Sequence, residues 1–356
     1  MTALERGAIA PAPPRAVARR AIRLWLLLAL AALAALALGA ACGTRGCAPL
    51  GLLDALLGRP GGGSDPALAR EIVLRLRLPR ALAGFAVGGL LALAGALMQV
   101  LLRNPLADPY VLGVSGGASF AALLAIWAGA GSTLLLGASW AGAALSIGLL
   151  FALDRPALRG PSLASASDAP TRLLLTGVIL ASGWGALITL VLTLAPDAKL
   201  RGMLFWLIGE LSGAPAWAPA LAALAVASAC AVAMARALNV LLAGDARAFA
   251  LGIDVRQLRF ATCLLGAAAT AFAVTTVGSL GFVGLLVPHA LRRVCGNDQR
   301  VLLPACALGG GILVVLADTV ARTLVAPQQL PVGAIMALLG VPAFLWVLLR
   351  NPGMTR

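Results

Sequence analysis

Charge is scarce in this chain of 356 residues, because only 11% of them are Asp, Glu, Lys or Arg. Soluble globular proteins carry roughly a quarter. Hydrophobic residues make up 61% of the chain, and so few charges could not keep a surface of this size in water. The composition therefore excludes a soluble domain, a disordered chain and a coiled coil, and it indicates a protein surrounded by lipid.

Lysine and histidine are almost missing as well. The single lysine, Lys199, does not follow a glycine-rich loop, which excludes a phosphate-binding P-loop in this chain. The single histidine, His289, excludes a metal helix with two histidines, and no Ser-His-Asp set is visible. We therefore expect no catalytic residue, no metal site and no cofactor bound by this chain, so that any ATP would be bound by partner subunits.

Acidic residues are also few, 13 against 27 basic ones, and the formal net charge is +14. In a soluble protein this excess would suggest nucleic acid. Here nearly all basic residues are arginines that lie between apolar runs, which is typical of topology signals at membrane edges. We therefore expect membrane lipid and not nucleic acid around this chain.

Ten apolar runs are candidates for helices that cross the hydrocarbon core, which takes about 20 residues. They are 22–41, 80–102, 109–129, 132–153, 172–195, 216–243, 260–276, 280–296, 301–321 and 331–350. The seventh and eighth are short, and the run 203–213 is too short to cross, so we expect it along the membrane surface. The predicted fold class is an all-α, polytopic membrane protein.

Ten crossings place both chain ends on one side of the membrane. That side then holds eighteen of the 27 basic residues, so the positive-inside rule predicts that both termini are cytosolic. The predicted organisation is a cytosolic tail (1–21), one transmembrane domain (22–350) and a cytosolic tail (351–356). Of the six cysteines only Cys42 and Cys47 share a loop, and whether they pair is left open.

The segment 103–117 concentrates prolines, glycines and capping residues. Asn104 precedes Pro105, and Asp108 precedes Pro109. Each pair matches a helix N-cap followed by proline at the first helical position. We expect a sharp turn on the cytosolic side of the membrane.

The loop 244–259 is predicted to hold two short helices, one capped by Asp245 and one by Asp254. These helices would present apolar side chains to the cytosol, namely Phe249, Leu251 and Ile253. Further on, Pro288 is expected to kink a helix beside His289, which is either a structural residue or a capping or gating group.

Several motifs, in order along residues 70–350, resemble the FecCD-type permeases, the membrane subunits of ATP-binding-cassette importers for iron chelates, haem and cobalamin. They are Arg77-Leu-Pro-Arg80, the run through Gly95-Ala-Leu-Met-Gln99, Asn104-Pro-Leu-Ala107, Leu112-Gly-Val-Ser-Gly-Gly117, Gly281-Phe-Val-Gly-Leu-Leu-Val-Pro-His289 and Leu330-Pro-Val-Gly333. The resemblance implies a transport subunit in a bacterial inner membrane that works as a homodimer with two cytosolic ATPase subunits and a periplasmic substrate-binding protein.

The resemblance also implies roles for particular residues. The ATPases would grip the loop 244–259, and the binding protein would dock on outer arginines. The gate would lie at the cytosolic turn, and the fifth and tenth spans would line the pathway. The implied residues are Gly252, Asp254 and Arg256 for coupling; Arg77, Arg80 and Arg322 for docking; Asn104, Leu106 and Thr171 for the gate; and Ser182, Trp184, Thr189, Met336 and Leu339 for the pathway.

The cargo implied by this resemblance is an iron complex, either a siderophore or haem, with cobalamin as the alternative. An ion-coupled secondary transporter is an alternative of another class, and it would call for broken helices and ion ligands at mid-membrane depth. Only the break at 275–279 fits that pattern. An intramembrane enzyme would need a nucleophile, a metal set or an acid–base pair, and the chain offers none.

Overall fold

The computed structural model describes residues 14–43, 46–47, 66–153, 163–212 and 216–350, and it is helical nearly throughout these residues. The predicted tail 351–356 and most of the tail 1–21 lie outside them. The helices are α1 (Pro14–Ala41), α3 (Pro66–Ile72), the π-helical η1 (Val73–Arg77), α4 (Leu78–Leu101), the 3₁₀-helical η2 (Pro109–Leu112), α5 (Val114–Trp127), α6 (Ser132–Leu153), α8 (Leu163–Leu194), α9 (Asp197–Ile208), α10 (Trp217–Leu242), α11 (Asp245–Ala250), α12 (Val255–Val277), α13 (Val283–Cys295), α14 (Gln299–Thr323) and α15 (Val332–Arg350).

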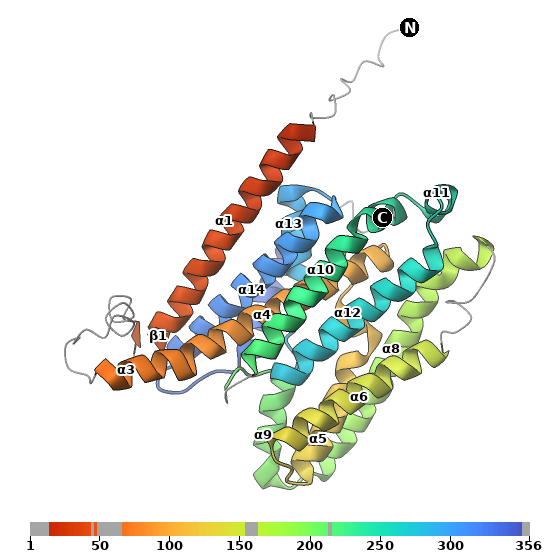
Figure 1. The fold of residues 1–356 in the computed structure, drawn as a ribbon. Coiled ribbons are helices and arrows are strands. Elements are labelled where there is room, and N and C mark those ends of the chain that lie inside the picture. The colour runs from red at the N-terminus through yellow and green to blue at the C-terminus, as the bar shows by residue number, and fades with distance from the viewer. Residues whose placement is uncertain (1–13, 44–45, 48–65, 154–162, 213–215, 351–356) are drawn as a thin grey trace.

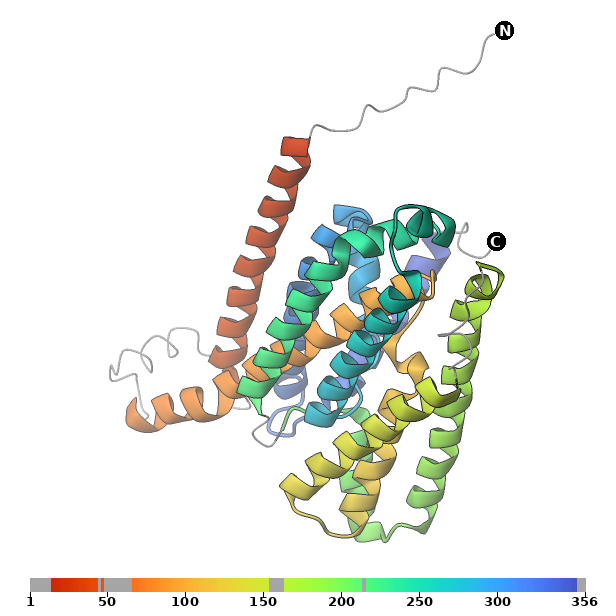
Figure 2. The same ribbon diagram turned by 45° about the vertical axis from the view of Figure 1, so that its right-hand side comes forward.

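The long helices run side by side between two ends of the bundle (Figures 1 and 2). The inner end carries α11, the start of α1 and the end of α15, and the outer end carries α3, α9 and the strand pair that follows α1. Both ends of the described chain therefore lie at the inner end, as the even number of predicted crossings requires. The apolar run predicted at 203–213 overlaps α9, whose helix ends at Ile208.

Seven helical stretches among the described residues are long and apolar enough to cross a membrane. They correspond to the predicted first, second, fourth, fifth, sixth, seventh and ninth runs. The other three predicted runs hold α5, α13 and α15, with 14, 13 and 19 residues. The all-α membrane fold is thus confirmed, with seven helices long enough to cross and shorter helices in the places of the other three predicted runs.

Two of the predicted lengths were wrong for local reasons. The third run loses its first turn because Asp108 caps the separate helix η2, and Gly113 then adopts a left-handed backbone with a φ of 74°. The seventh run is longer than expected, 23 residues, because its helix starts at Val255 directly after its cap Asp254. The second short helix predicted in the loop 244–259 is therefore the beginning of α12.

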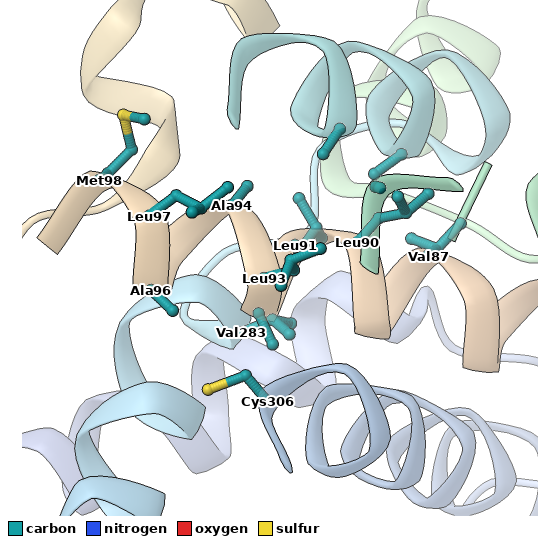
Figure 3. Packing of buried hydrophobic residues seen from close by; sticks show 14 of the residues in the cluster. Val87, Leu90, Leu91, Leu93, Ala94, Ala96, Leu97, Met98, Val283 and Cys306 are labelled. Carbon is teal, nitrogen blue, oxygen red and sulfur yellow. The ribbon is translucent and has the colours of Figure 1, made fainter. Parts of the chain in front are cut away.

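The helix α4 forms the centre of the bundle, between α10, α12, α13 and α14 (Figure 1). Its sequence is apolar on every side, as expected of a helix that is buried all round. In Figure 3 its side chains Leu93 and Ala96 point toward Val283 of α13 and Cys306 of α14. The largest cluster of buried apolar residues is built around this helix.

Glycines let the backbones of α4 and its neighbours touch. A Cβ atom on Gly88 would lie 2.8 Å from the carbonyl carbon of Gly310, and one on Gly310 would lie 2.8 Å from that of Gly88. A Cβ atom on Gly95 would likewise run into the backbone of Gly284. Small residues at such crossings give membrane helices the close packing that holds them together, since lipid supplies no hydrophobic force between them.

The outer end of α1 continues into a two-stranded antiparallel pair, β1 (Cys42–Gly43) and β2 (Gly46–Cys47). Along the backbone, Cys42 lies opposite Cys47. Cys42 is disulfide-bonded, whereas Cys230, Cys295 and Cys306 are free thiols. The strand β1 contacts α14 and α1.

The contact between Gly88 and Gly310 generates a prediction for stability. We expect Gly88→Ala to lower the unfolding free energy of the purified protein in detergent by about 1–3 kcal/mol, because the added methyl group must push α4 and α14 apart. Thermal unfolding followed by tryptophan fluorescence measures the loss. Gly148→Ala on α6 is the control, since nothing lies within 4 Å of its Cβ position, and equal melting temperatures for the two variants would contradict the prediction.

Candidate functional sites at the two ends of the bundle

A buried cluster of charges joins α4 to α14 at the outer end. Arg80 donates to both carboxylate oxygens of Asp318, at 2.8 and 3.1 Å, and Arg322 approaches the same carboxylate at 3.0 Å. The three side chains are only 12%, 2% and 4% exposed. Asp318 and Arg322 lie four residues apart on one face of α14, the spacing at which opposite charges on a helix can pair. Arg80 is a second partner, 238 residues away along the chain.

The remaining donors of this cluster bind backbone oxygens at the end of α1. Arg322 donates to the carbonyl of Cys42 at 3.1 Å and to that of Gly39 at 3.0 Å, and Arg77 donates to the carbonyl of Ala41 at 3.0 Å. The last carbonyls of a helix have no partner within it and carry partial negative charge. The arginines therefore supply hydrogen-bond donors to the carbonyls at the end of α1 as well as to the carboxylate of Asp318.

The three predicted docking residues Arg77, Arg80 and Arg322 all belong to this cluster. Arg322 is only 3% exposed, and both ends of its guanidinium are bonded inside the protein. Arg77 and Arg80 are half-buried. Arg80 reaches toward the margin of the protein, where its Nη1 donates to Gln329 at 2.8 Å. The sequence offered no signal for the contacts of Arg80 with Asp318 or of Arg77 and Arg322 with the end of α1, because these partners are distant along the chain.

At the inner end, the turn after α4 is built from side chains that bond to their own backbone. Asn104 accepts from the backbone N–H of Leu106 at 2.9 Å, and Asp108 accepts from that of Tyr110 at 2.8 Å. Asp108 therefore caps η2 with Pro109 in the first turn, as predicted. Asn104, in contrast, caps a turn and not a helix. The Tyr110 hydroxyl then donates to the carbonyl of Leu280 and accepts from its N–H.

The three predicted gate residues come from two segments. Asn104 and Leu106 lie on this turn, and Thr171 lies on α8 with its side chain exposed. Packing between α8 and η2 centres on Gly177, where a Cβ atom would lie 3.1 Å from the Cα of Leu112. Gly177 is six residues beyond Thr171 along α8. The grouping of these residues into a gate stays a prediction.

The helix α11 presents an apolar surface at the inner end. Phe249 is 67% and Leu251 69% exposed, and the adjacent Gly252, Asp254 and Arg256 are exposed as well. Gly252 has a φ of 74°, which favours glycine at this position. Two expectations for this loop were wrong. Ile253 packs against the core, and Asp245 does not cap α11, because its carboxylate binds Arg103 and Arg259.

A second aspartate at the inner end, Asp298, is the N-cap of α14. It accepts hydrogen bonds from the side chain and the backbone of Arg300, and from the Asn239 side chain of α10 at 2.7 Å. The bonds from Arg300, followed by that from Asn239, lower the pKa of Asp298 to about 2. The cap is therefore charged at neutral pH, where it favours the start of α14.

The five predicted pathway residues face two different ways. Ser182 and Thr189 on α8 are exposed, and so is Leu339 on α15. Trp184 and Met336 are buried within the chain. Trp184 donates from its indole N–H to the Ser146 hydroxyl on α6 at 3.0 Å. The grouping of the five residues into a pathway stays a prediction. The helices α8 and α15 are apolar on all sides, so their sequences did not indicate which side faces the interior of the bundle.

His289 lies inside α13 and is 8% exposed, so it does not cap that helix. Its burial favours the structural interpretation over a gating group. No group of three or more His, Cys, Asp or Glu side chains that could hold a metal ion occurs in the described part of the chain. The polar groups at the two ends are thus suited to holding helices and to meeting partners.

The model of the FecCD transport family matches residues 26–350. The chain belongs to this family. The match extends the resemblance beyond residues 70–350 to most of the first apolar run. The chain is therefore a multi-pass membrane permease subunit, and ATP hydrolysis in such transporters is carried out by separate subunits.

Known permeases resemble this one over most of their length. It is 41% identical to the cobalamin import system permease protein BtuC of Halobacterium salinarum, over 80% of this chain and 74% of that one. It is 39% identical to the hemin transport system permease protein HmuU of Yersinia pestis (79% and 84%) and 38% identical to the Fe(3+) dicitrate transport system permease protein FecD of Escherichia coli (78% and 85%).

A solved structure of similar fold is that of a transporter described as a metal-chelate type ABC transporter in an inward-facing conformation. It superposes on the permease with a TM-score of 0.75 and 27% identity, over 92% of this chain and 99% of that one. The arrangement of helices is thus shared along nearly the whole chain.

The outer charge cluster generates the next prediction. We expect Asp318→Asn to lower the unfolding free energy in detergent by about 3–5 kcal/mol, because two buried guanidinium groups lose their anionic partner. Glu71→Gln is the control, since it breaks a pair with Arg75 in which both side chains are more than half exposed. Such a surface pair contributes at most about 1 kcal/mol. Equal stability losses in the two variants would disprove the special role of Asp318.

Proposed function

We propose that this permease imports an iron complex, a ferric siderophore or haem, across a bacterial inner membrane. The observation that carries the proposal is the match to permeases whose names state haemin, ferric dicitrate and cobalamin as cargo, at 38–41% identity. Two of these three carry iron, so an iron complex is the first choice. Cobalamin is the second, supported by the 41% identical relative.

The working unit in this proposal is a homodimer with the solute pathway between the two copies. The helix α8 supports it, because its exposed side combines apolar residues such as Leu187 and Leu190 with Ser182 and Thr189. The hydroxyls of Ser182 and Thr189 donate to carbonyls of their own helix at 2.9 Å. A lining whose polar groups are satisfied in this way binds a solute weakly, which suits passage.

Two ATPase subunits bind the inner end in this proposal, and a periplasmic binding protein docks at the outer end. The surface of α11, with Phe249, Leu251 and the adjacent Gly252, Asp254 and Arg256, supports the first assignment. Exposed apolar side chains beside charged ones are what a protein partner covers. The cluster of Arg77, Arg80 and Arg322 supports the second, since it holds three cations and a single carboxylate, and acidic groups of a partner would be attracted to the excess positive charge.

Uptake of labelled cargo tests the proposed function. We expect cells that lack the gene to lose uptake of a labelled ferric siderophore or of haem, and to regain it when the gene is restored together with its ATPase. Labelled cobalamin is offered in parallel, and loss of cobalamin uptake alone would replace iron as the cargo. Uptake that continues with an ATPase unable to hydrolyse ATP would support an ion-coupled carrier instead.

Docking at the outer end has its own test. We expect Arg77→Glu to weaken capture of the loaded binding protein by the permease in detergent at least tenfold, because the substitution reverses charge beside the half-buried Arg80. Arg75→Glu, two residues earlier and exposed, is the control and should change capture little. Surface plasmon resonance gives both dissociation constants. A normal constant for Arg77→Glu, in a variant that melts at the parental temperature, would refute docking at Arg77.

A further inference from the structure

One carboxylate at the inner end connects three helices and a turn. Asp245, the first residue of α11, binds Arg103 through Oδ1 and Arg259 through Oδ2, the second at 2.7 Å. Arg259 lies in the first turns of α12. Arg103 lies in the turn that follows α4, and the same Nη2 atom also donates to the carbonyl of Leu241 in the last turn of α10, at 3.2 Å.

These contacts are more than a surface ion pair. The side chains of Asp245 and Arg259 are only 14% and 9% exposed, and that of Arg103 is 38% exposed. Charges that are largely shielded from water attract each other more strongly than exposed ones. Arg103 also has a φ of 49°, which is uncommon for a residue with a side chain. The turn thus holds the backbone of Arg103 in an unfavourable conformation, and the guanidinium of this residue contacts α11.

The position of Asp245 matters because of what lies on its two sides. On one side, the exposed Phe249 on α11 and Leu251 directly after it lie four and six residues away along the chain. On the other side, Arg103 directly precedes Asn104, where the turn toward η2 begins. The surface available to a cytosolic partner and the turn at the inner mouth of the bundle are therefore joined through a single carboxylate.

We infer that Asp245 is a positioning residue that transmits movement of α11 to the turn 102–108, so that ATP hydrolysis by the partner subunits drives transport. This inference rests on the proposed function, in that ATPase subunits act on α11. A displacement of α11 carries the carboxylate with it, and Arg103 must follow or lose its partner. The turn 102–108 then moves together with α11 and not with α4.

The experiment uses the complete transporter, with its ATPase subunits, in proteoliposomes supplied with the loaded binding protein. ATP hydrolysis and uptake are measured on the same vesicles. We expect Asp245→Asn, which keeps the shape of the side chain and removes its charge, to lower the cargo transported per ATP hydrolysed at least fivefold. A residue that only stabilises the fold would lower both rates together and leave this ratio unchanged.

Asp298→Asn is the matched control. Asp298 is also an aspartate at the inner end that pairs with an arginine, but its partner Arg300 is on the same helix and two residues away. We expect this variant to keep the parental ratio. If the parental transporter itself shows no ATP-dependent uptake, the proposed function is wrong; if it does, and Asp245→Asn keeps the parental ratio, the inference about Asp245 is wrong.

Arg103→Gln tests the linkage from its other side, without a change on α11, and it decides the matter should Asp245→Asn fail to assemble. We expect the same fall in the ratio, and we expect the double variant to fall no further than either single one, because all three break one interaction. Losses that multiply in the double variant, or an unchanged ratio in Arg103→Gln, would overturn the inference.

Discussion

Backbone contact around α4 is the constraint on which the other parts of this permease depend. Gly88 meets Gly310 of α14, and Gly95 meets Gly284 of α13, with no side chain between the helices. In a membrane the attraction between helices comes largely from such close packing, since lipid is as apolar as the helices themselves. The helix α4 thereby becomes a fixed reference, and the functional residues at both ends are placed relative to it.

The charges of the chain are distributed around this reference so that few of them lie deep in the bundle. At the outer end, Asp318 is bound by Arg80 and Arg322 and is therefore not an isolated buried anion, which would be costly in a membrane. Arg80 belongs to the start of α4, and Asp318 belongs to the end of α14. The polar cluster therefore fixes the same two helices that the glycines bring together further along, and it adds the end of α1 to them.

Features that depend on neighbours in sequence could be predicted, and features that depend on distant residues could not. The ten apolar runs, the caps Asp108 and Asp254 and the pair Asp318–Arg322 all follow from patterns within a few residues. The contacts of Arg80 with Asp318 and of Arg103 with Asp245 join segments more than 130 residues apart, and no local pattern indicates them.

The sequence also did not indicate which side of a membrane helix faces the interior of the bundle. In a soluble helix the apolar side marks the interior, but α8 and α15 are apolar on all sides because lipid, partner and core are all compatible with such residues. Hydropathy therefore did not separate the buried Trp184 and Met336 from the exposed Thr189 and Leu339. The indole of Trp184 and the hydroxyl of Ser146 form a contact that turns this side of α8 toward α6, and these residues are 38 positions apart.

The two ends of the bundle differ in how firmly they are held, and this difference fits a transporter that must open. At the outer end, Arg80 and Arg322 bind one carboxylate, and Arg77 and Arg322 bind the carbonyls of Gly39, Ala41 and Cys42, so a movement there would break many bonds at once. At the inner end, the hydrogen bonds of Leu106 and Ala107 go to Asn104 within the same turn, and Arg103 supplies the connections to α10 and α11. A turn held by local bonds and one charged contact can shift as a unit while it keeps its own shape. A small displacement of the inner turn thus breaks fewer bonds than one at the outer end, and the turn lies beside the surface where a partner would apply it.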